Sequence, residues 1–136
     1  MTESILKEYF ENKISPEILS ADLNGSIKKL TYDTSEISVI RMESDIEFEI
    51  KQSHLNKIIN DALNGNLTFD NLKIIASGLI FSEYFIWDSD TKIGNRIATI
   101  ITELDNTKIN FPISTENLKL WKDYLASGVH KLKRHE

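Results

Sequence analysis

The chain has no cysteine among its 136 residues, which excludes disulfide bonds and thiolate chemistry and fits a reducing cytosol. Long apolar runs are also missing. The longest uncharged one, at 74–82, is far shorter than the roughly 20 residues of a membrane-spanning helix. Glu3 and Glu8 precede any apolar run, so no signal peptide is expected. These absences predict a cytoplasmic protein without membrane association.

Signatures of catalysis and of metal binding are absent too. The chain contains no glycine-rich phosphate loop, no nucleophile elbow and no HExxH motif. The stretch "DSDTKIGNRIAT" fails as a calcium loop, because Lys92 and Gly94 occupy ligand positions. His54 is expected to be exposed, whereas His130 and His135 lie in a basic tail that is expected to be frayed and solvent-exposed. We therefore predict no catalytic residue, no metal and no cofactor, and a protein that is not an enzyme.

Charge of both signs is present, but it is unevenly distributed. Lys and Arg number 16 and Asp and Glu number 21, which gives a net charge of −5. The last residues, 119–136, are basic, whereas residues 33–49 hold six acids and a single base, Arg41. An acidic face repels nucleic acid and speeds encounter with basic partners, although a merely solvating surface is the plainer reading. Nucleic-acid binding is not expected, since the aromatic residues accompany acids and not bases.

Apolar periodicity predicts helices in the second half of the chain. The stretch 68–81 is apolar on most sides, which is typical of a central helix, and Gly78 within it suggests a close helix crossing. Gly65 and Gly128 can supply left-handed helix ends. The predicted helices, each starting at its capping residue, are 53–65 (Ser53), 68–81 (Thr68), 90–104 (Asp90) and 114–128 (Ser114).

The first half is less regular. One helix is predicted from Glu3 and a second from Ser15-Pro16, followed by strands at 26–33, 36–43 and 45–51. These elements predict an α+β, mostly helical fold, with a helical bundle in the C-terminal half and a small antiparallel sheet from the N-terminal half. We expect one domain over 1–136, made of helix plus short strands (1–52), the bundle (53–126) and a basic tail (127–136).

Residues 5–19 and 58–72 match at an offset of 53, for example Leu6 with Ile59 and Leu19 with Leu72. Each stretch reads as a helix, a short turn and the start of a second helix. Shared capping chemistry accounts for the match without a duplication.

Two segments combine acids with apolar residues. In "ESDIEFEIK" the acids alternate with Ile46, Phe48 and Ile50, which predicts four carboxylates on one strand face. In "FSEYFIWDSD" consecutive large apolar residues cannot all face inward, so Tyr84 or Trp87 should lie near the surface, as in an interface hot spot for a basic partner. Alternatively, Trp87 pins the helix turn. The candidate partner-binding residues are Glu43, Asp45, Glu47, Glu49, Glu83, Tyr84, Trp87, Asp88 and Asp90.

The segments "ALNGNLTFDNLKIIASGLIFSEYFIWDSD" and "INFPISTENLKLWKDYL" resemble small bacterial immunity proteins of polymorphic and contact-dependent toxin systems. The resemblance covers roughly residues 53–126 and consists of capping and core pattern. It implies stoichiometric inhibition of a cognate toxin, often a basic nuclease, by an acidic surface.

We therefore expect an acidic, cytoplasmic binding protein that neutralises a basic protein toxin and is a monomer or a weak homodimer. One alternative is an adaptor or self-associating domain without a toxin partner. Another is a small-molecule or metal-dependent enzyme, which would need a cleft with converging titratable groups.

Overall fold

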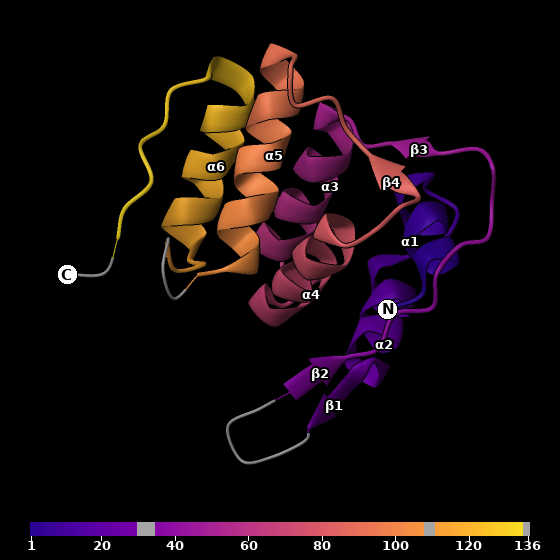
Figure 1. Cartoon of the computed structure of the whole chain (residues 1–136). Coiled ribbons are helices and arrows are strands. Elements are labelled where there is room, and N and C mark those ends of the chain that lie inside the picture. The colour runs from indigo at the N-terminus through magenta and orange to yellow at the C-terminus, as the bar shows by residue number, and fades with distance from the viewer. Residues whose placement is uncertain (30–34, 108–110, 135–136) are drawn as a thin grey trace.

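The computed structural model describes residues 1–29, 35–107 and 111–134, and over these residues the chain is mostly helical (Figure 1). The helices are α1 (Glu3–Phe10), α2 (Pro16–Gly25), α3 (Gln52–Leu63), α4 (Phe69–Ile80), α5 (Lys92–Asp105) and α6 (Thr115–Ser127). The strands are very short: β1 (Ile27–Lys29), β2 (Ser35–Ile37), β3 (Phe48–Glu49) and β4 (Phe85–Ile86). In this described part, no helix combines the length and the apolar character needed to cross a membrane.

The predicted α+β fold with a small antiparallel sheet from the N-terminal half is wrong. The strands form two separate pairs, and the pair that lies against the helices is parallel: β3 pairs with β4, which comes from the second half of the chain. Among the described residues, antiparallel pairing comprises three residue pairs between β1 and β2. Residues 30–34, part of the first expected strand, lie outside the described residues.

The segment that leads to β3 is held by one isolated parallel bridge, between Ile40 and Thr2, and by side-chain hydrogen bonds. The Arg41 guanidinium donates to the Phe81 carbonyl at 2.8 Å, and the Met42 amide donates to the Glu3 carboxylate at 2.7 Å. Ile46, expected to face the core, is 79% exposed. The alternation of buried and exposed residues therefore holds only from Phe48 to Ile50, and Glu43, Asp45, Glu47 and Glu49 do not share one strand face.

Capping chemistry explains where the helices begin. Thr68 and Ser114 cap α4 and α6 as predicted, and Gly128 ends α6 in the left-handed conformation, with φ of 79°. Two predicted caps are off by one or two residues. Thr91, not Asp90, caps α5 through its hydroxyl, and α3 begins after Lys51, whose amide donates to Nδ1 of His54 at 2.8 Å, so Ser53 lies inside the helix.

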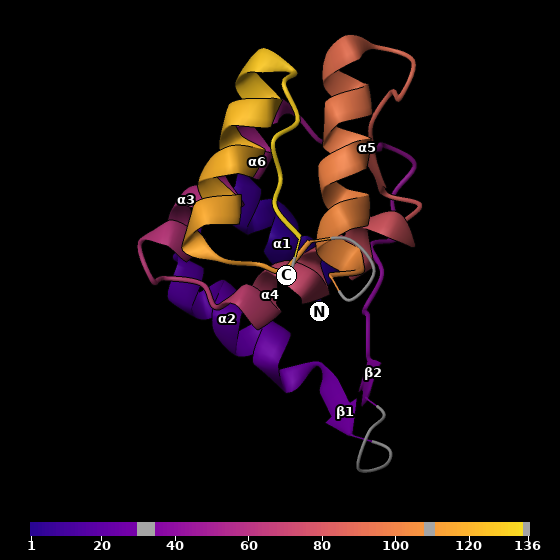
Figure 2. The same cartoon turned by 90° about the vertical axis from the view of Figure 1, so that its left-hand side faces the viewer.

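The helices pack as neighbouring pairs around a common apolar core. In Figure 1, α6, α5 and α3 follow one another from left to right, and α4 crosses below and contacts α5, α3 and α2. Figure 2 shows β1 and β2 projecting from the end of α2, away from the other helices. Every helix contributes to the core, for example through Leu6, Leu19, Ile58, Leu72, Ile97 and Leu118.

The α1–α2 and α3–α4 hairpins are alike in detail. Their turns contain Asn12 and Gly65, both with positive φ (61° and 80°), and these positions are related by the same offset of 53 that the sequence shows. The buried Asn71 links the hairpins, since its amide accepts from Ser20 and donates to Asn24 of α2, both at 3.1 Å. The matched positions therefore adopt the same turn geometry. The chemistry of helix ends is sufficient to explain the sequence match between the two hairpins.

Gly78 permits a close approach, but not the expected helix crossing. The side chain of Met1 lies against it, and a Cβ atom at Gly78 would sit 2.3 Å from Cε of Met1. Met1 is itself buried, and its amino group donates to the Ser38 carbonyl at 2.6 Å.

The basic tail, expected to be frayed, instead packs against α5 and α6 over residues 128–134 (Figure 2). The Asn117 side chain donates to the Lys133 carbonyl at 2.9 Å and accepts from its amide at 3.1 Å. His130 Nε2 lies 2.9 Å from the carboxylate of Glu103, which is buried. His135 and Glu136 lie outside the described residues.

Candidate partner-binding surface

Parallel pairing of β3 with β4 brings the two acidic segments together. The Phe48 amide donates to the Tyr84 carbonyl and the Ile50 amide donates to the Ile86 carbonyl, both at 2.8 Å. This register places Glu49 opposite Ile86. Residues that are nearly forty positions apart in the chain therefore lie at one edge of the molecule.

Three of the predicted binding residues line one cleft: Glu49, Trp87 and Asp88. The others are spread around it. Glu43, Asp45 and Glu47 lie on the segment that leads into β3, Glu83 and Tyr84 lie just before β4, and Asp90 lines a separate hollow at the start of α5.

The seven predicted carboxylates are all exposed. Within the described ranges, none of them lies within ion-pair distance of a lysine, an arginine or a histidine. Arg41, the single base of the segment 33–49, is bound to the Phe81 carbonyl. We call these seven residues the acidic surface: Glu43, Asp45, Glu47, Glu49, Glu83, Asp88 and Asp90.

The aromatic residues of this region are distributed differently from the prediction. Tyr84 is only 7% exposed, and its burial raises the pKa of its hydroxyl, with Glu11 and Glu3 acting in the same direction. Trp87 is half-buried. The exposed ring is that of Phe81, at 67%, and sequence reasoning had placed it at the end of the central helix without predicting its exposure.

Exposed aliphatic residues complete the surface and were not predicted. Ile46 is 79% exposed between Asp45 and Glu47, and Ile86 is 38% exposed between the buried Phe85 and the half-buried Trp87. The sequence offers one indication that Ile86 is exposed: it belongs to the run Tyr84–Trp87, in which four consecutive apolar residues cannot all be buried. An apolar residue surrounded by charges is typical of a protein interface, where a dry anchor has a polar rim.

A cluster of aromatic rings packs β3 and β4 against α1 and α3. Phe48 lies between Phe10 of α1 and Phe85 of β4, with ring centroids at 6.0 and 5.6 Å. His54 of α3 contacts the rings of Phe10 and Phe48 at 5.0 and 5.1 Å. Aromatic pairs at these separations stabilise a fold beyond their buried area, so β3 and β4 are held on a rigid base.

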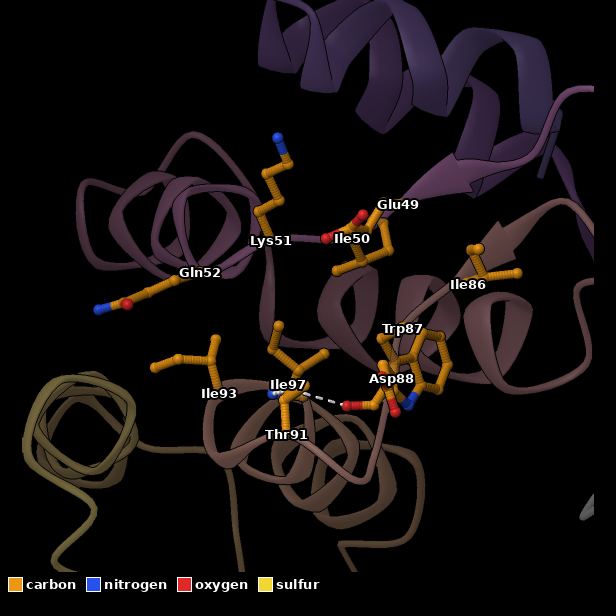
Figure 3. A pocket seen from close by; sticks show the side chains of 11 residues that line it. Glu49, Ile50, Lys51, Gln52, Ile86, Trp87, Asp88, Thr91, Ile93 and Ile97 are labelled. Carbon is orange, nitrogen blue, oxygen red and sulfur yellow. Dashed lines mark hydrogen bonds between the residues drawn. The ribbon is translucent and has the colours of Figure 1, made fainter.

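The cleft itself measures about 530 Å³. Its walls come from the end of β3 and the start of α3 (Glu49–Gln52), from the end of β4 (Ile86–Asp88) and from the start of α5 (Figure 3). Gly94 allows α5 to begin here, because a Cβ at this position would lie 1.6 Å from the Asp88 carbonyl oxygen. The cleft thus depends on close backbone contact between the β4–α5 connection and the first turn of α5.

The titratable groups outside this surface serve mainly in local contacts in the described part of the chain. Among the described residues, no three His, Asp or Glu side chains are placed to hold a metal ion. Contrary to the prediction, His54 is partly buried, and burial followed by the nearby Lys51 lowers the pKa of its imidazole. Glu103 accepts from Trp121 and contacts His130, which joins α5, α6 and the tail.

No protein-family model, no curated protein and no solved structure matches this chain.

Proposed function

We propose that the protein is a non-catalytic, cytoplasmic binding protein that neutralises a basic protein toxin by covering it with the acidic surface. The observation that supports this proposal is the β3–β4 pairing, which gathers unpaired carboxylates and exposed apolar side chains at one edge. The resemblance of residues 53–126 to small immunity proteins points in the same direction.

Electrostatics favours a basic partner. Carboxylates without an internal counter-ion repel one another, and a cationic partner relieves this repulsion when it binds. Close charge pairs across an interface can couple by roughly 1.5–7 kcal/mol, and the field also raises the association rate. Ile46 and Ile86 supply apolar area that the partner can bury, which charge alone would not provide.

The first test is capture from lysate of the source organism at low salt, followed by expression of the captured protein alone. We expect a basic partner that is toxic by itself and harmless when co-expressed with this protein. Its association rate constant should fall about tenfold or more when ionic strength rises from about 0.02 M to about 0.3 M. A rate that stays constant with salt would contradict the electrostatic part of the proposal.

Matched charge reversals locate the surface. Asp88→Lys should weaken neutralisation and slow association, because it places a cation against the partner's cations. Asp123→Lys introduces the same charge change on the exposed side of α6, across α5 from β4 (Figure 1), and should leave both unchanged. Equal effects of the two variants would show that only net charge matters.

Self-association is a second candidate, favoured by the exposure of Phe81 beside a hollow lined by Ile37, Val39 and Arg41. Sedimentation velocity over a concentration series tests it. A dimer that Phe81→Ser converts to monomers, without a toxic partner in the lysate, would support an adaptor domain in place of a toxin inhibitor.

A further inference from the structure

The cleft beside Trp87 combines three features: its volume, an apolar lining and nearby carboxylates. Its volume of about 530 Å³ lies within the range of small-ligand sites. Its walls include the aliphatic side chains of Ile50, just before α3, of Ile86 in β4, and of Ile93 and Ile97 in α5. Two carboxylates line it from different sides: Asp88 lies beside the Trp87 indole, and Glu49 lies next to Ile50 at the end of β3 (Figure 3).

We propose that this cleft receives an arginine side chain of the partner protein, an inference that rests on the proposed binding function. The aliphatic stem of the arginine would lie against Ile86 and Ile93. The guanidinium would stack on the indole of Trp87 and donate to Asp88, while Glu49 adds a second negative charge on the other side of the cleft. Arginine fits better than lysine because its planar, weakly hydrated cation can stack on an aromatic ring while its edge donates to a carboxylate.

The carboxylates are available for this role. Asp88 Oδ1 accepts from the Asp90 amide at 3.0 Å, which fixes the side chain and leaves Oδ2 without a partner in the described structure. Lys51 is the single cation among the lining residues. Figure 3 shows it directed away from Asp88, and it forms no ion pair with Glu49 or Asp88. The edge of the cleft is therefore net negative.

An NMR titration of the full-length protein with N-acetyl-arginine amide tests the proposal. The chain has two tryptophans, Trp87 at the cleft and the buried Trp121, so the two indole N–H signals report on the cleft and on an internal reference. We expect a saturable shift of the Trp87 signal in the millimolar range while that of Trp121 stays fixed. N-acetyl-citrulline amide has the same shape without the charge and should give no saturable shift.

Neutral variants add a second comparison. Glu49→Gln with Asp88→Asn should weaken arginine binding about threefold to tenfold, as expected for the loss of two partly exposed charge pairs. Asp70→Asn with Asp123→Asn removes the same charge from exposed positions outside the cleft and should leave the affinity unchanged. Equal weakening by both double variants, an equal shift with citrulline amide, or an equal affinity for N-acetyl-lysine amide would overturn the proposal.

The inference can fail while the proposed function stands. Neutralisation of the captured toxin that is unaffected by Trp87→Ala and by the Glu49→Gln/Asp88→Asn variant, both checked for a native spectrum, would show that the partner binds without entering the cleft. Loss of neutralisation with both of these variants, and with neither Asp70→Asn nor Asp123→Asn, is the result expected if an arginine occupies it.

Discussion

The Glu103 carboxylate accepts a hydrogen bond from the indole nitrogen of Trp121 at 3.1 Å, inside the contact between α5 and α6. Trp121 is fully buried and Glu103 is 8% exposed, so the indole N–H depends on this one acceptor. Removing the acceptor should therefore leave a buried donor unsatisfied.

Glu103→Ala is expected to lower the free energy of unfolding by about 1–3 kcal/mol, which is the usual cost of a buried donor without an acceptor. Urea unfolding followed by circular dichroism at neutral pH measures it. Glu116→Ala is the matched control, because Glu116 forms an exposed ion pair with Lys133 and should cost less than about 1 kcal/mol. Equal losses in the two variants would contradict a structural role for the Glu103–Trp121 bond.

Acidification should destabilise the protein through His54. Its folded-state pKa is lowered by burial and by Lys51, and its Nδ1 accepts the Lys51 amide, which requires the neutral ring. The unfolded state therefore binds a proton more readily. The contribution of His54 is fully present above its unfolded pKa of about 6.5 and is lost as pH falls through the lower folded pKa.

The replacement His54→Gln tests this assignment, because glutamine can accept the same amide without titrating. Urea midpoints measured from about pH 7.5 to about pH 5 should fall less in the variant than in the original protein. His130 and His135 are unchanged in both, so they cancel in the comparison. Parallel curves would mean that His54 does not contribute to the acid sensitivity.

Two glycines should differ in their tolerance of alanine. At Gly94 the new Cβ would meet the Asp88 backbone oxygen at 1.6 Å, whereas at Gly78 it would meet the flexible end of Met1. A side chain can move aside and a backbone connection cannot. Gly94→Ala should therefore lower the free energy of unfolding by about 1–3 kcal/mol or more. Gly78→Ala should lower it distinctly less, because the gain in helix propensity of about 1 kcal/mol can offset a clash that a side-chain movement relieves.

Thermal unfolding of the two glycine variants shows which of them loses more stability. Gly94→Ala should also alter the cleft, visible as a changed Trp87 indole signal, whereas Gly78→Ala should not. A larger loss of stability at Gly78 would show that Met1 is held more firmly than its flexible side chain suggests.

Alkaline pH should weaken the contact between α1 and α3. The Tyr9 hydroxyl donates to Asp61, and burial together with this bond raises the pKa of Tyr9 far above its usual value. The unfolded chain releases this proton near pH 10, so the contribution is fully present below that pH and is lost as pH rises above it.

Tyr9→Phe should flatten this alkaline loss and cost roughly 0.5–1.5 kcal/mol at neutral pH for the missing hydrogen bond. Unfolding measured from about pH 9 to about pH 11.5 makes the comparison. Tyr84, whose pKa is also raised, is present in both proteins and contributes equally to both curves. An unchanged slope in the variant would refute the assignment to Tyr9.

Local chemistry explains which parts of the fold could be predicted from sequence. Thr68, Ser114 and Gly128 act within their own helices, so their roles follow from nearest neighbours. The predicted strand 45–51 is reduced to Phe48–Glu49, and its predicted antiparallel pairing is wrong, because an alternating pattern does not say which strand is the partner. The partner here is β4, and its pairing depends on how α3 and α4 pack, which no local pattern records.

The candidate site was predictable in composition but not in geometry. Acids near 45–49 and 83–90 were visible in the sequence, whereas their union around one cleft depends on the β3–β4 register. Of the two rings expected near the surface, Trp87 is half-buried at the cleft and Tyr84 turns inward beside Phe48, while the exposure of Phe81 after the last turn of α4 was not predicted. The docking of the tail was missed because it uses Glu103 and Asn117, which lie on two different helices.

The strand β3 is paired on one side only within the described structure, and two exposed carboxylates belong to it or adjoin it, those of Glu49 and Glu47. If two copies paired along the free edge of β3, their carboxylates would lie close together, so charge repulsion opposes sheet extension and aggregation. Neutral replacements remove this repulsion, whereas lysine replacements keep it with positive charges. The solubility of variants with neutral residues at these positions should therefore be checked at increasing protein concentration. Lysine variants are the better choice for studying this edge, because their charge keeps them from aggregating.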